Sequence, residues 1–342
     1  MEKLQNQDRE RKCACTGVRY CKDCNDPEFR KQFKDLYPID DILEAQQKVL
    51  TYVTCELCNR FKLKNELNIS QSDQNNGNND KQDDQNYQSF IDQCIGHLTS
   101  EQLDFGGLYT INDFISEEFE QDIVNKLQDY KWVDSQSGRK KIDFGPQVNF
   151  KKQKLKYTKF TGFPLFIKPI LDLIQTLNDE ILQEKIEEQK NQQKPQLKEN
   201  LPSVLKDFIP IEVNVLEYDE QRGSNIAPHK DDFWLWGERI IGINLLQDTF
   251  MTFQRDSQNQ IGQIVEIEVP VKRRMLYIIS GKSRFEWMHG IKSEHIKGKR
   301  IVCTIREFSD EFKSQDNEDA NKIRAIAKTY IQANIKYQFC NK

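Results

Sequence analysis

The chain contains 342 residues, and its 50 Lys and Arg residues against 54 Asp and Glu residues give a formal net charge of -4. This near balance argues against a protein that is basic over its whole surface, but it leaves room for a local basic strip. Only 37% of the residues are hydrophobic, yet 20 Phe, 11 Tyr and 4 Trp exceed what a disordered chain carries. We therefore expect a folded domain that polar segments interrupt.

Residues 1–64 are expected to form a small Cys-rich module. Six of its cysteines are candidate zinc ligands: Cys13, Cys15, Cys21, Cys24, Cys55 and Cys58. Thiolates at such short spacings suit a tetrahedral zinc ion, which either the first four or the last four of these cysteines would complete. The alternative is a tail whose thiols bind no metal.

The first residues, MEKLQNQDRERKC, lack the apolar stretch of a signal peptide, so we expect reduced thiols rather than disulfides. Three further cysteines stand alone in the sequence and are expected to be structural: Cys94, Cys303 and Cys340. No apolar run approaches the roughly 18–20 residues that span a bilayer, so we expect no membrane partner.

Two polar segments interrupt the chain. Residues 71–88 read QSDQNNGNNDKQDDQNYQ and cannot bury enough surface to offset their ordering entropy, which predicts a disordered linker over residues 65–100. Residues 183–200 read QEKIEEQKNQQKPQLKEN and are expected to extend a helix that begins near Pro169. We interpret this second segment as a surface insertion.

The main domain is expected over residues 101–312. From Ile211 onward, seven short β-rich runs follow one another, separated by polar turns: IEVNVLEY, RIIGINLL, FMTFQR, IVEIEV, RMLYIIS, RFEWMH and RIVCTIREF. This pattern predicts a mainly β fold with flanking helices (α+β), specifically a double-stranded β-helix or jelly roll. Apolar residues at helical spacing predict a docked helix within residues 313–342.

Two of the four histidines stand in a pattern that suggests a metal site. His229 and Asp231 project to the same side of an extended chain, and His289 ends the run RFEWMH. Two imidazoles and one carboxylate form the facial triad that binds Fe(II) and leaves positions open for oxygen chemistry. By spacing, His295 is an alternative to His289, because each lies eleven residues before an arginine; we prefer His289, since His295 lies in a polar turn.

Arg300 and Arg306 are expected on one face of the strand RIVCTIREF. Two guanidinium groups that point into a barrel are costly unless they meet anions. A small dicarboxylate would supply two such anions, whereas the alternative is a pair of structural salt bridges to Asp or Glu.

These features together resemble the AlkB family of Fe(II)/2-oxoglutarate dioxygenases, and most closely its fourth animal branch. The matching strings are CACTGVRYCKDC at 13–24, SQSGRKKIDFGPQVNFKKQKLK at 135–156, RGSNIAPHKDDFWLWGERIIGINLL at 222–246, WMHGI at 287–291 and RIVCTIREFSDEF at 300–312. The resemblance implies that His229, Asp231 and His289 bind iron. It also implies that Arg300, Arg306 and Tyr218 contact 2-oxoglutarate, which reacts with O2, and it leaves open which arginine holds which carboxylate.

Three positions depart from the pattern of bacterial family members. Val302 and Leu216 replace expected Asn residues, and Phe233 stands where a second acidic residue helps to select a methylated base. The last departure argues against base repair of the bacterial type.

Residues 139–159 carry eight positive charges and one negative charge, with aromatic residues between them. In the AlkB family this region corresponds to a substrate lid, for which the candidate residues are Arg139, Lys140, Lys141, Phe144, Asn149, Lys151 and Lys152. The strip would contact an anionic partner, either nucleic acid or an acidic protein surface. The alternative is a solvated hairpin.

The sequence and the resemblance together predict a monomeric dioxygenase of the cytoplasm or nucleus that removes N-methyl groups from a macromolecule. The candidate substrates are methyl-lysine on a protein such as actin and N6-methyladenine in DNA. We favour the protein substrate, because Phe233 replaces the acidic residue that helps to select a methylated base. The alternative is a non-catalytic adaptor that binds a partner through its Cys-rich module and basic strip.

Overall fold

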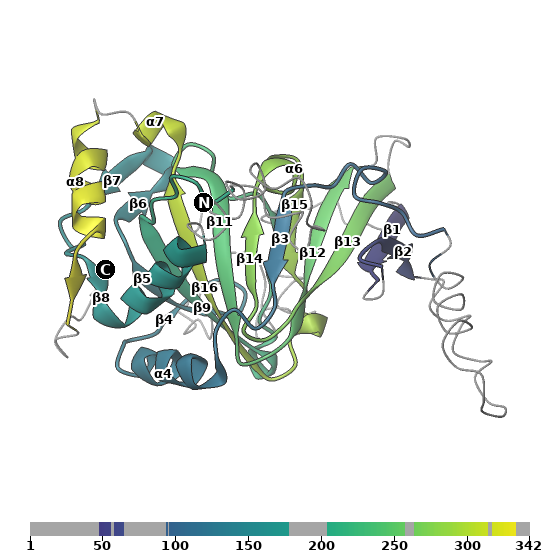
Figure 1. Ribbon diagram of the computed structural model, residues 1–342, viewed down its shortest axis with the longest axis horizontal. Coiled ribbons are helices and arrows are strands. Elements are labelled where there is room, and N and C mark those ends of the chain that lie inside the picture. Colours follow the sequence, from purple (N-terminus) through teal and green to yellow (C-terminus); the bar gives the residue numbers. More distant parts are fainter. Residues whose placement is uncertain are drawn as a thin grey trace, which may run out of the picture.

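The computed structural model describes residues 48–55, 58–64, 94, 96–177, 204–256, 263–313 and 317–332. The cysteines at 13–24, the Asn/Gln-rich stretch and the insertion at 183–200 lie outside these ranges. Within these ranges β-strands predominate over helices, and most of the helices lie to one side of the sheets (Figure 1).

Two sheets form the body of the molecule. Across the seven-stranded sheet the order is β3 (Leu108–Ile111), β14 (Leu276–Ile279), β11 (Trp236–Leu245), β16 (Lys299–Phe308), β9 (Glu212–Asp219), β5 (Lys140–Phe144) and β4 (Val133–Asp134). Across the six-stranded sheet it is β10 (Ile226–His229), β15 (Met288–Ile291), β12 (Thr249–Asp256), β13 (Gln263–Val271), β1 (Lys48–Thr54) and β2 (Phe61–Leu63). Neighbouring strands are antiparallel except β1 and β13, which are parallel.

The two sheets pack face to face, because one cluster of buried side chains draws on strands of both. Ile240 of β11 and Val302 of β16 meet Phe253 of β12 and Ile267 of β13 in this cluster. Alternate residues of β16 face the opposite way: Cys303 is fully buried in a second cluster, as expected for a small structural residue. The jelly-roll prediction is therefore confirmed.

Helices cover the outer face of the seven-stranded sheet (Figure 1). The helix α4 (Glu117–Leu127) begins where the Ser116 hydroxyl accepts a hydrogen bond from the Phe119 backbone N–H, at 3.1 Å. Residues 168–177 are also helical and bury Ile170 in the same cluster. None of the described helices has the length and apolar character needed to cross a bilayer.

Short elements complete the fold. They are the hairpin strands β6 (Gln147–Asn149) and β7 (Lys154–Lys156), the parallel pair β8 (Phe163–Pro164) and β17 (Tyr330–Ile331), the helices α6 (Gly281–Phe285), α7 (Asp310–Lys313) and α8 (Glu318–Ala327), and the 3-10 turns η3 (Phe150–Lys152), η4 (Leu165–Ile167), η5 (Glu220–Arg222) and η6 (Ser293–His295).

Two expectations about elements need correction. The run RFEWMH is not one strand: Arg284 and Phe285 belong to α6, and the strand begins only at Met288. The C-terminal helix α8 is docked as expected, with Ile323 fully buried, but it ends at Ala327. The chain then turns, and the Thr329 carbonyl accepts a hydrogen bond from the Phe163 backbone N–H at 3.0 Å, which starts the β17–β8 pair.

Candidate active site

The two histidines and the aspartate expected to bind metal lie together. His229 ends β10 and pairs across the sheet with His289 of β15, and a carboxylate oxygen of Asp231 lies 3.5 Å from Nε2 of His229. One ligand atom from each of the three side chains lies within 4.8 Å of the other two. His295 lies elsewhere, with Nε2 3.4 Å from the carboxylate of Glu268. The geometry thus groups His289, not His295, with His229 and Asp231.

A hydrogen bond orients His229, and the pKa values of His289 and Asp231 are shifted in the direction that suits a metal ligand. The Ala227 carbonyl, 2.9 Å from Nδ1 of His229, can only accept, so Nδ1 carries the proton and Nε2 presents a lone pair. Burial, together with His229, lowers the pKa of His289 to about 3 and keeps the imidazole neutral. Burial alone would raise the pKa of Asp231, but Arg306 and the two histidines hold it well below its usual range.

Arg300 is 1% exposed and faces the same cavity as the three candidate ligands. Its Nε donates to Oδ1 of Asn244 at 2.7 Å, and its guanidinium lies 4.9 Å from the centroid of the Tyr218 ring. Its two terminal nitrogens have no hydrogen-bond partner within the described part of the chain. Buried, unpaired guanidinium nitrogens are costly, so this side chain is suited to an anion that enters the cavity.

Arg306 lies on the same face of β16 but has a different environment. Its Nε donates to Asp231 at 3.1 Å, and a terminal nitrogen donates to Glu212 at 2.6 Å. Burial alone would lower the pKa of Arg306, but the two carboxylates raise it above its usual range. The structural salt bridge that was the alternative for both arginines is therefore found for Arg306, whereas Arg300 makes no described salt bridge.

Several residues in and around the cavity could not be predicted from the sequence. Asn244 is a buried amide in an apolar strand, which is a visible signal, but its partner Arg300 lies 56 positions away. Tyr277 lines the cavity, and its ring fits there because Gly242 has no side chain: a Cβ at Gly242 would lie 2.0 Å from the ring. Arg284, which is fully buried, donates to the backbone carbonyl of Asp231 at 2.9 Å.

The residues expected in a substrate lid are distributed over a strand and the neighbouring hairpin. Lys140, Lys141 and Phe144 lie in β5, Asn149 ends β6, and Lys151 and Lys152 lie in η3. The Asn149 side chain accepts from the Lys152 backbone N–H at 3.0 Å and so begins the η3 turn. Phe144 is buried and packs edge-to-face against Tyr130. Arg139 is also buried, over the Tyr218 ring, so it supports the cavity rather than an exposed lid.

An open groove of about 700 Å³ lies between β5 and the hairpin. Six lysines line it: Lys131, Lys141, Lys152, Lys154, Lys156 and Lys159. Its acidic lining residues are Asp143, which pairs with Lys141, and Glu212, which pairs with Arg306. Because Arg306 also contacts Asp231, the groove borders the candidate metal site.

Comparisons with known proteins agree with this geometry, although no family model matches the chain. The chain is 33% identical over 259 residues to the alpha-ketoglutarate-dependent dioxygenase alkB homolog 4 of Mus musculus, which covers 68% of this chain and 76% of the relative. The human protein of that name is 33% identical over 233 residues, covering 61% and 69%. A DNA N6-methyl adenine demethylase of Caenorhabditis elegans is 29% identical over 311 residues, covering 89% of each chain.

Proposed function

Because the chain belongs to the AlkB family of 2-oxoglutarate-dependent dioxygenases, we propose that His229, Asp231 and His289 bind Fe(II). Members of this family use Fe(II) and 2-oxoglutarate, and the relatives identify the chain as an enzyme of the demethylase class. The donor set fits the metal, since two imidazoles and one carboxylate converge and leave other coordination positions open. Because these relatives are named as enzymes, they argue against the alternative that the chain is a non-catalytic adaptor.

The cosubstrate is proposed to bind through Arg300. The single observation that carries this assignment is the pair of buried terminal nitrogens of Arg300, unpaired among the described residues, in the cavity that contains the three ligands. A guanidinium can donate two parallel hydrogen bonds to a carboxylate. The Nε–Asn244 hydrogen bond and the contact with the Tyr218 ring fix the orientation of the Arg300 guanidinium. Arg300 would thus take the distal carboxylate of 2-oxoglutarate, and Arg306 would orient Asp231.

When bound, iron and 2-oxoglutarate supply the O2-dependent oxidation of an N-methyl group, which then leaves as formaldehyde. The chain's own residues hold and orient the reactants. Arg306 keeps the Asp231 carboxylate ionised and directed, and the buried wall around Tyr277 excludes water from the cosubstrate.

The substrate is proposed to be methyl-lysine on an acidic protein surface, such as that of actin. The lysines of the groove favour an anionic partner at the entrance to the site. Phe233, where bacterial members carry a base-selecting acid, is exposed, and its ring lies 5.5 Å from that of Phe285. The Arg284 guanidinium lies 4.7 Å and 5.2 Å from the two ring centroids, so the pair already contacts one cation and offers its exposed ring surface to a methylated side chain.

A second candidate is N6-methyladenine in DNA. It is favoured by the Caenorhabditis elegans relative, whose name states that activity and which covers 89% of this chain. The same lysines would then contact phosphates, and the exposed aromatic rings would stack on a base.

Formaldehyde release from a panel of substrates distinguishes the candidates. The panel contains a methyl-lysine actin peptide, folded methylated actin, N6-methyladenine DNA and methylated RNA, each with wild type and with the His229→Ala variant. We expect release from the methylated actin substrates by wild type alone. Release from DNA alone would replace the first candidate with the second, and equal release by the variant would refute the iron assignment.

For the cysteines of the N-terminal segment we propose Zn(II) as a second metal. Thiolate ligands select zinc, whereas Mg²⁺, Ca²⁺ and Mn²⁺ prefer oxygen ligands. Cys13, Cys15, Cys21 and Cys24 lie outside the described residues. Cys55 and Cys58 follow β1 and can be placed.

A further inference from the structure

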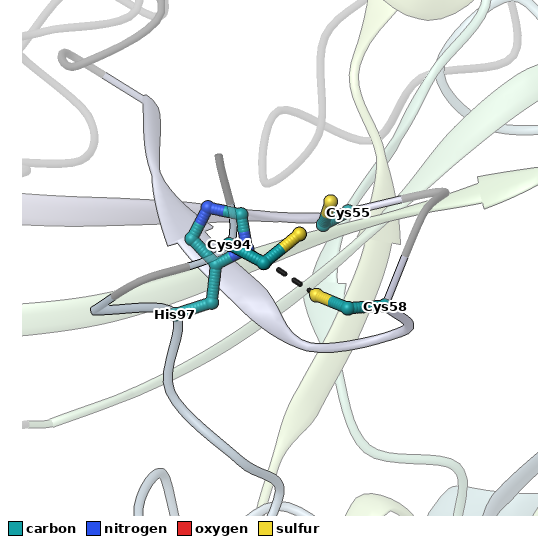
Figure 2. A group of neighbouring side chains, drawn as sticks. All are labelled: Cys55, Cys58, Cys94 and His97. Carbon is teal, nitrogen blue, oxygen red and sulfur yellow. Dashed lines mark hydrogen bonds between the residues drawn. The ribbon is translucent and has the colours of Figure 1, made fainter. Parts of the chain in front are cut away.

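Four side chains that the proposed activity does not use meet beside β1 and β2. Figure 2 shows Cys55, Cys58, Cys94 and His97 turned toward one another. One ligand atom from each side chain lies within 4.8 Å of the other three, and Sγ of Cys58 lies 3.3 Å from Nδ1 of His97. The three cysteines are thiols rather than disulfides. Cys94, expected from the sequence to stand alone, is thus part of a group.

The backbone holds these ligands in two tight turns. In the first turn, the Cys55 N–H donates to the Arg60 carbonyl at 2.7 Å, and the Asn59 N–H donates to the Cys55 carbonyl at 2.9 Å. Asn59 has a φ of 54°, a left-handed conformation that Asn tolerates. In the second turn, the His97 N–H donates to the Cys94 carbonyl at 3.3 Å, across Gly96 with a φ of 83°.

A short antiparallel bridge joins the two turns. The backbone N–H of Phe61 donates to the Leu98 carbonyl at 2.9 Å, and the N–H of Leu98 donates to the Phe61 carbonyl at 2.8 Å. Each turn therefore presents a pair of ligands, with sequence pattern C-x-x-C in one and C-x-x-H in the other. The spacing between the pairs is fixed by backbone hydrogen bonds that do not depend on the ligands themselves.

We propose that Cys55, Cys58, Cys94 and His97 bind one structural Zn(II) ion. A tetrahedral zinc with Zn–S bonds of about 2.3 Å places sulfur ligands about 3.8 Å apart, so the group needs only small side-chain movements to close around the ion. Three thiolates and one imidazole complete the coordination and leave no position for a substrate. This set uses Cys55 and Cys58, as one of the two sets considered from the sequence does, but it replaces Cys21 and Cys24.

A second cluster of potential ligands serves as a contrast. Glu268 lies near Glu294 and His295, but its carboxylate already pairs with Lys64 at 2.7 Å and Lys292 at 3.1 Å. Two ammonium groups already neutralise this site, and its donors are mostly carboxylate oxygens, whereas the group of three cysteines and one histidine offers sulfur and nitrogen donors. The softer donors thus mark the zinc site.

The zinc would connect the edge of the six-stranded sheet to the rest of the barrel. It joins the chain before residue 65 to the chain after residue 93, and it fixes the turns that flank Phe61. The Phe61 ring packs on Phe105 at 5.8 Å, Phe105 on Phe253 at 5.0 Å, and Phe253 lies 6.3 Å from His289. Loss of zinc would loosen β1 and β2 and weaken the packing behind an iron ligand.

The test is the zinc content of the purified full chain, measured by elemental mass spectrometry. We expect the Cys58→Ser and Cys94→Ser variants each to lose one equivalent of zinc relative to wild type. A variant with Cys13, Cys15, Cys21 and Cys24 all changed to Ser and a Cys303→Ala variant should keep that equivalent. Retention of full zinc by Cys58→Ser or by Cys94→Ser, or a quadruple variant that loses no further zinc when Cys58→Ser is added, would overturn the proposal.

Conservative replacement separates ligation from misfolding. The His97→Cys variant should keep the zinc in a site of four thiolates, whereas His97→Ala should lose it or bind it far more weakly. Cobalt substitution adds a spectroscopic check, since thiolate-to-cobalt charge transfer should be weaker in Cys58→Ser than in wild type at unchanged circular dichroism. Identical cobalt spectra in wild type and Cys58→Ser would contradict the proposal. The His289→Ala variant should retain the zinc, which separates this site from the iron site.

Discussion

Arg300 and Arg306 occupy the same face of one strand, yet their partners give them different tasks. Arg306 is held by Asp231 and Glu212, whereas Arg300 is held at Nε by Asn244 and over its face by the Tyr218 ring, and its terminal nitrogens have no hydrogen-bond partner among the described residues. Spacing predicted that both would point inward, but it could not separate their roles. Their partners come from strands that are distant in the sequence, so that distinction required the fold.

Changing Arg300 to Lys should weaken binding of 2-oxoglutarate. A lysine cannot donate to Asn244 and to a carboxylate with the same planar fork, so we expect KM for 2-oxoglutarate to rise about tenfold or more, or ~1.4 kcal/mol. Succinate production at varied 2-oxoglutarate measures this. The matched control is Arg274→Lys, at an arginine that pairs with exposed Asp113. An unchanged KM in Arg300→Lys would contradict the assignment.

Burial of His289 should make the stability of the metal-free protein depend on pH. The pKa of His289 is lowered from 6.5 to about 3, so between these pH values the imidazole is protonated in the unfolded chain but not in the folded chain. Stability is therefore full above pH 6.5 and falls as the pH drops, by about 2 kcal/mol between pH 7 and pH 5 for this group. Urea titrations should show that His289→Asn loses about 2 kcal/mol less than wild type over this range. Equal losses would show that the imidazole is not held neutral.

At the scale of elements, the short helix α6 supports the loop that carries Asp231. Arg284 donates to the backbone carbonyls of Asp231 at 2.9 Å and Asp232 at 3.1 Å. Its guanidinium also lies 4.7 Å from the centroid of the Phe233 ring. The sequence predicted the long strands well because their alternation is local, but it treated RFEWMH as a strand. The reason is that the partners of Arg284 lie about 50 residues away, where no local pattern reveals them.

Changing Arg284 to Met should impair the site without touching any reactant. We expect the loop to lose its anchor and the apparent affinity for Fe(II) to fall about tenfold, with KM for 2-oxoglutarate nearly unchanged. Iron titration of succinate production measures both. Lys282→Met, on the exposed side of the same helix, is the control and should match wild type. If the apparent dissociation constant for Fe(II) and the KM for 2-oxoglutarate rose by the same factor, general unfolding rather than loss of positioning would be indicated.

The hairpin of β6, η3 and β7 should determine how tightly a macromolecular substrate binds. Changing Lys154 and Lys156 to Glu reverses two charges in the groove, so we expect kcat/KM for the substrate to fall about fivefold or more at low salt. Turnover of 2-oxoglutarate without substrate should not change. The control reverses Lys126 in α4 and Lys328 at the end of α8, neither of which lines the groove. An equal decrease in both double variants would exclude a specific role for the hairpin.

At the scale of the whole molecule, the two proposed metal sites lie along one sheet. The proposed zinc site lies at the ends of β1 and β2, and β1, β13, β12 and β15 are consecutive neighbours up to the strand of His289. The sequence predicted the jelly roll and the grouping of His229, Asp231 and His289, because a known family carries that spacing. It did not join Cys94 and His97 to Cys55 and Cys58, because the two pairs are separated by a polar segment and are brought together by the Phe61–Leu98 bridge, which no local pattern reveals.

The proposed iron site of His229, Asp231 and His289 can be tested by succinate production. The assay compares iron-loaded wild type, His289→Ala and His295→Ala, with methylated substrate present. We expect His289→Ala to lose activity to background, and His295→Ala, which lacks only a partner of Glu268, to retain most of it. Full activity of His289→Ala, or loss of activity in His295→Ala alone, would contradict the account.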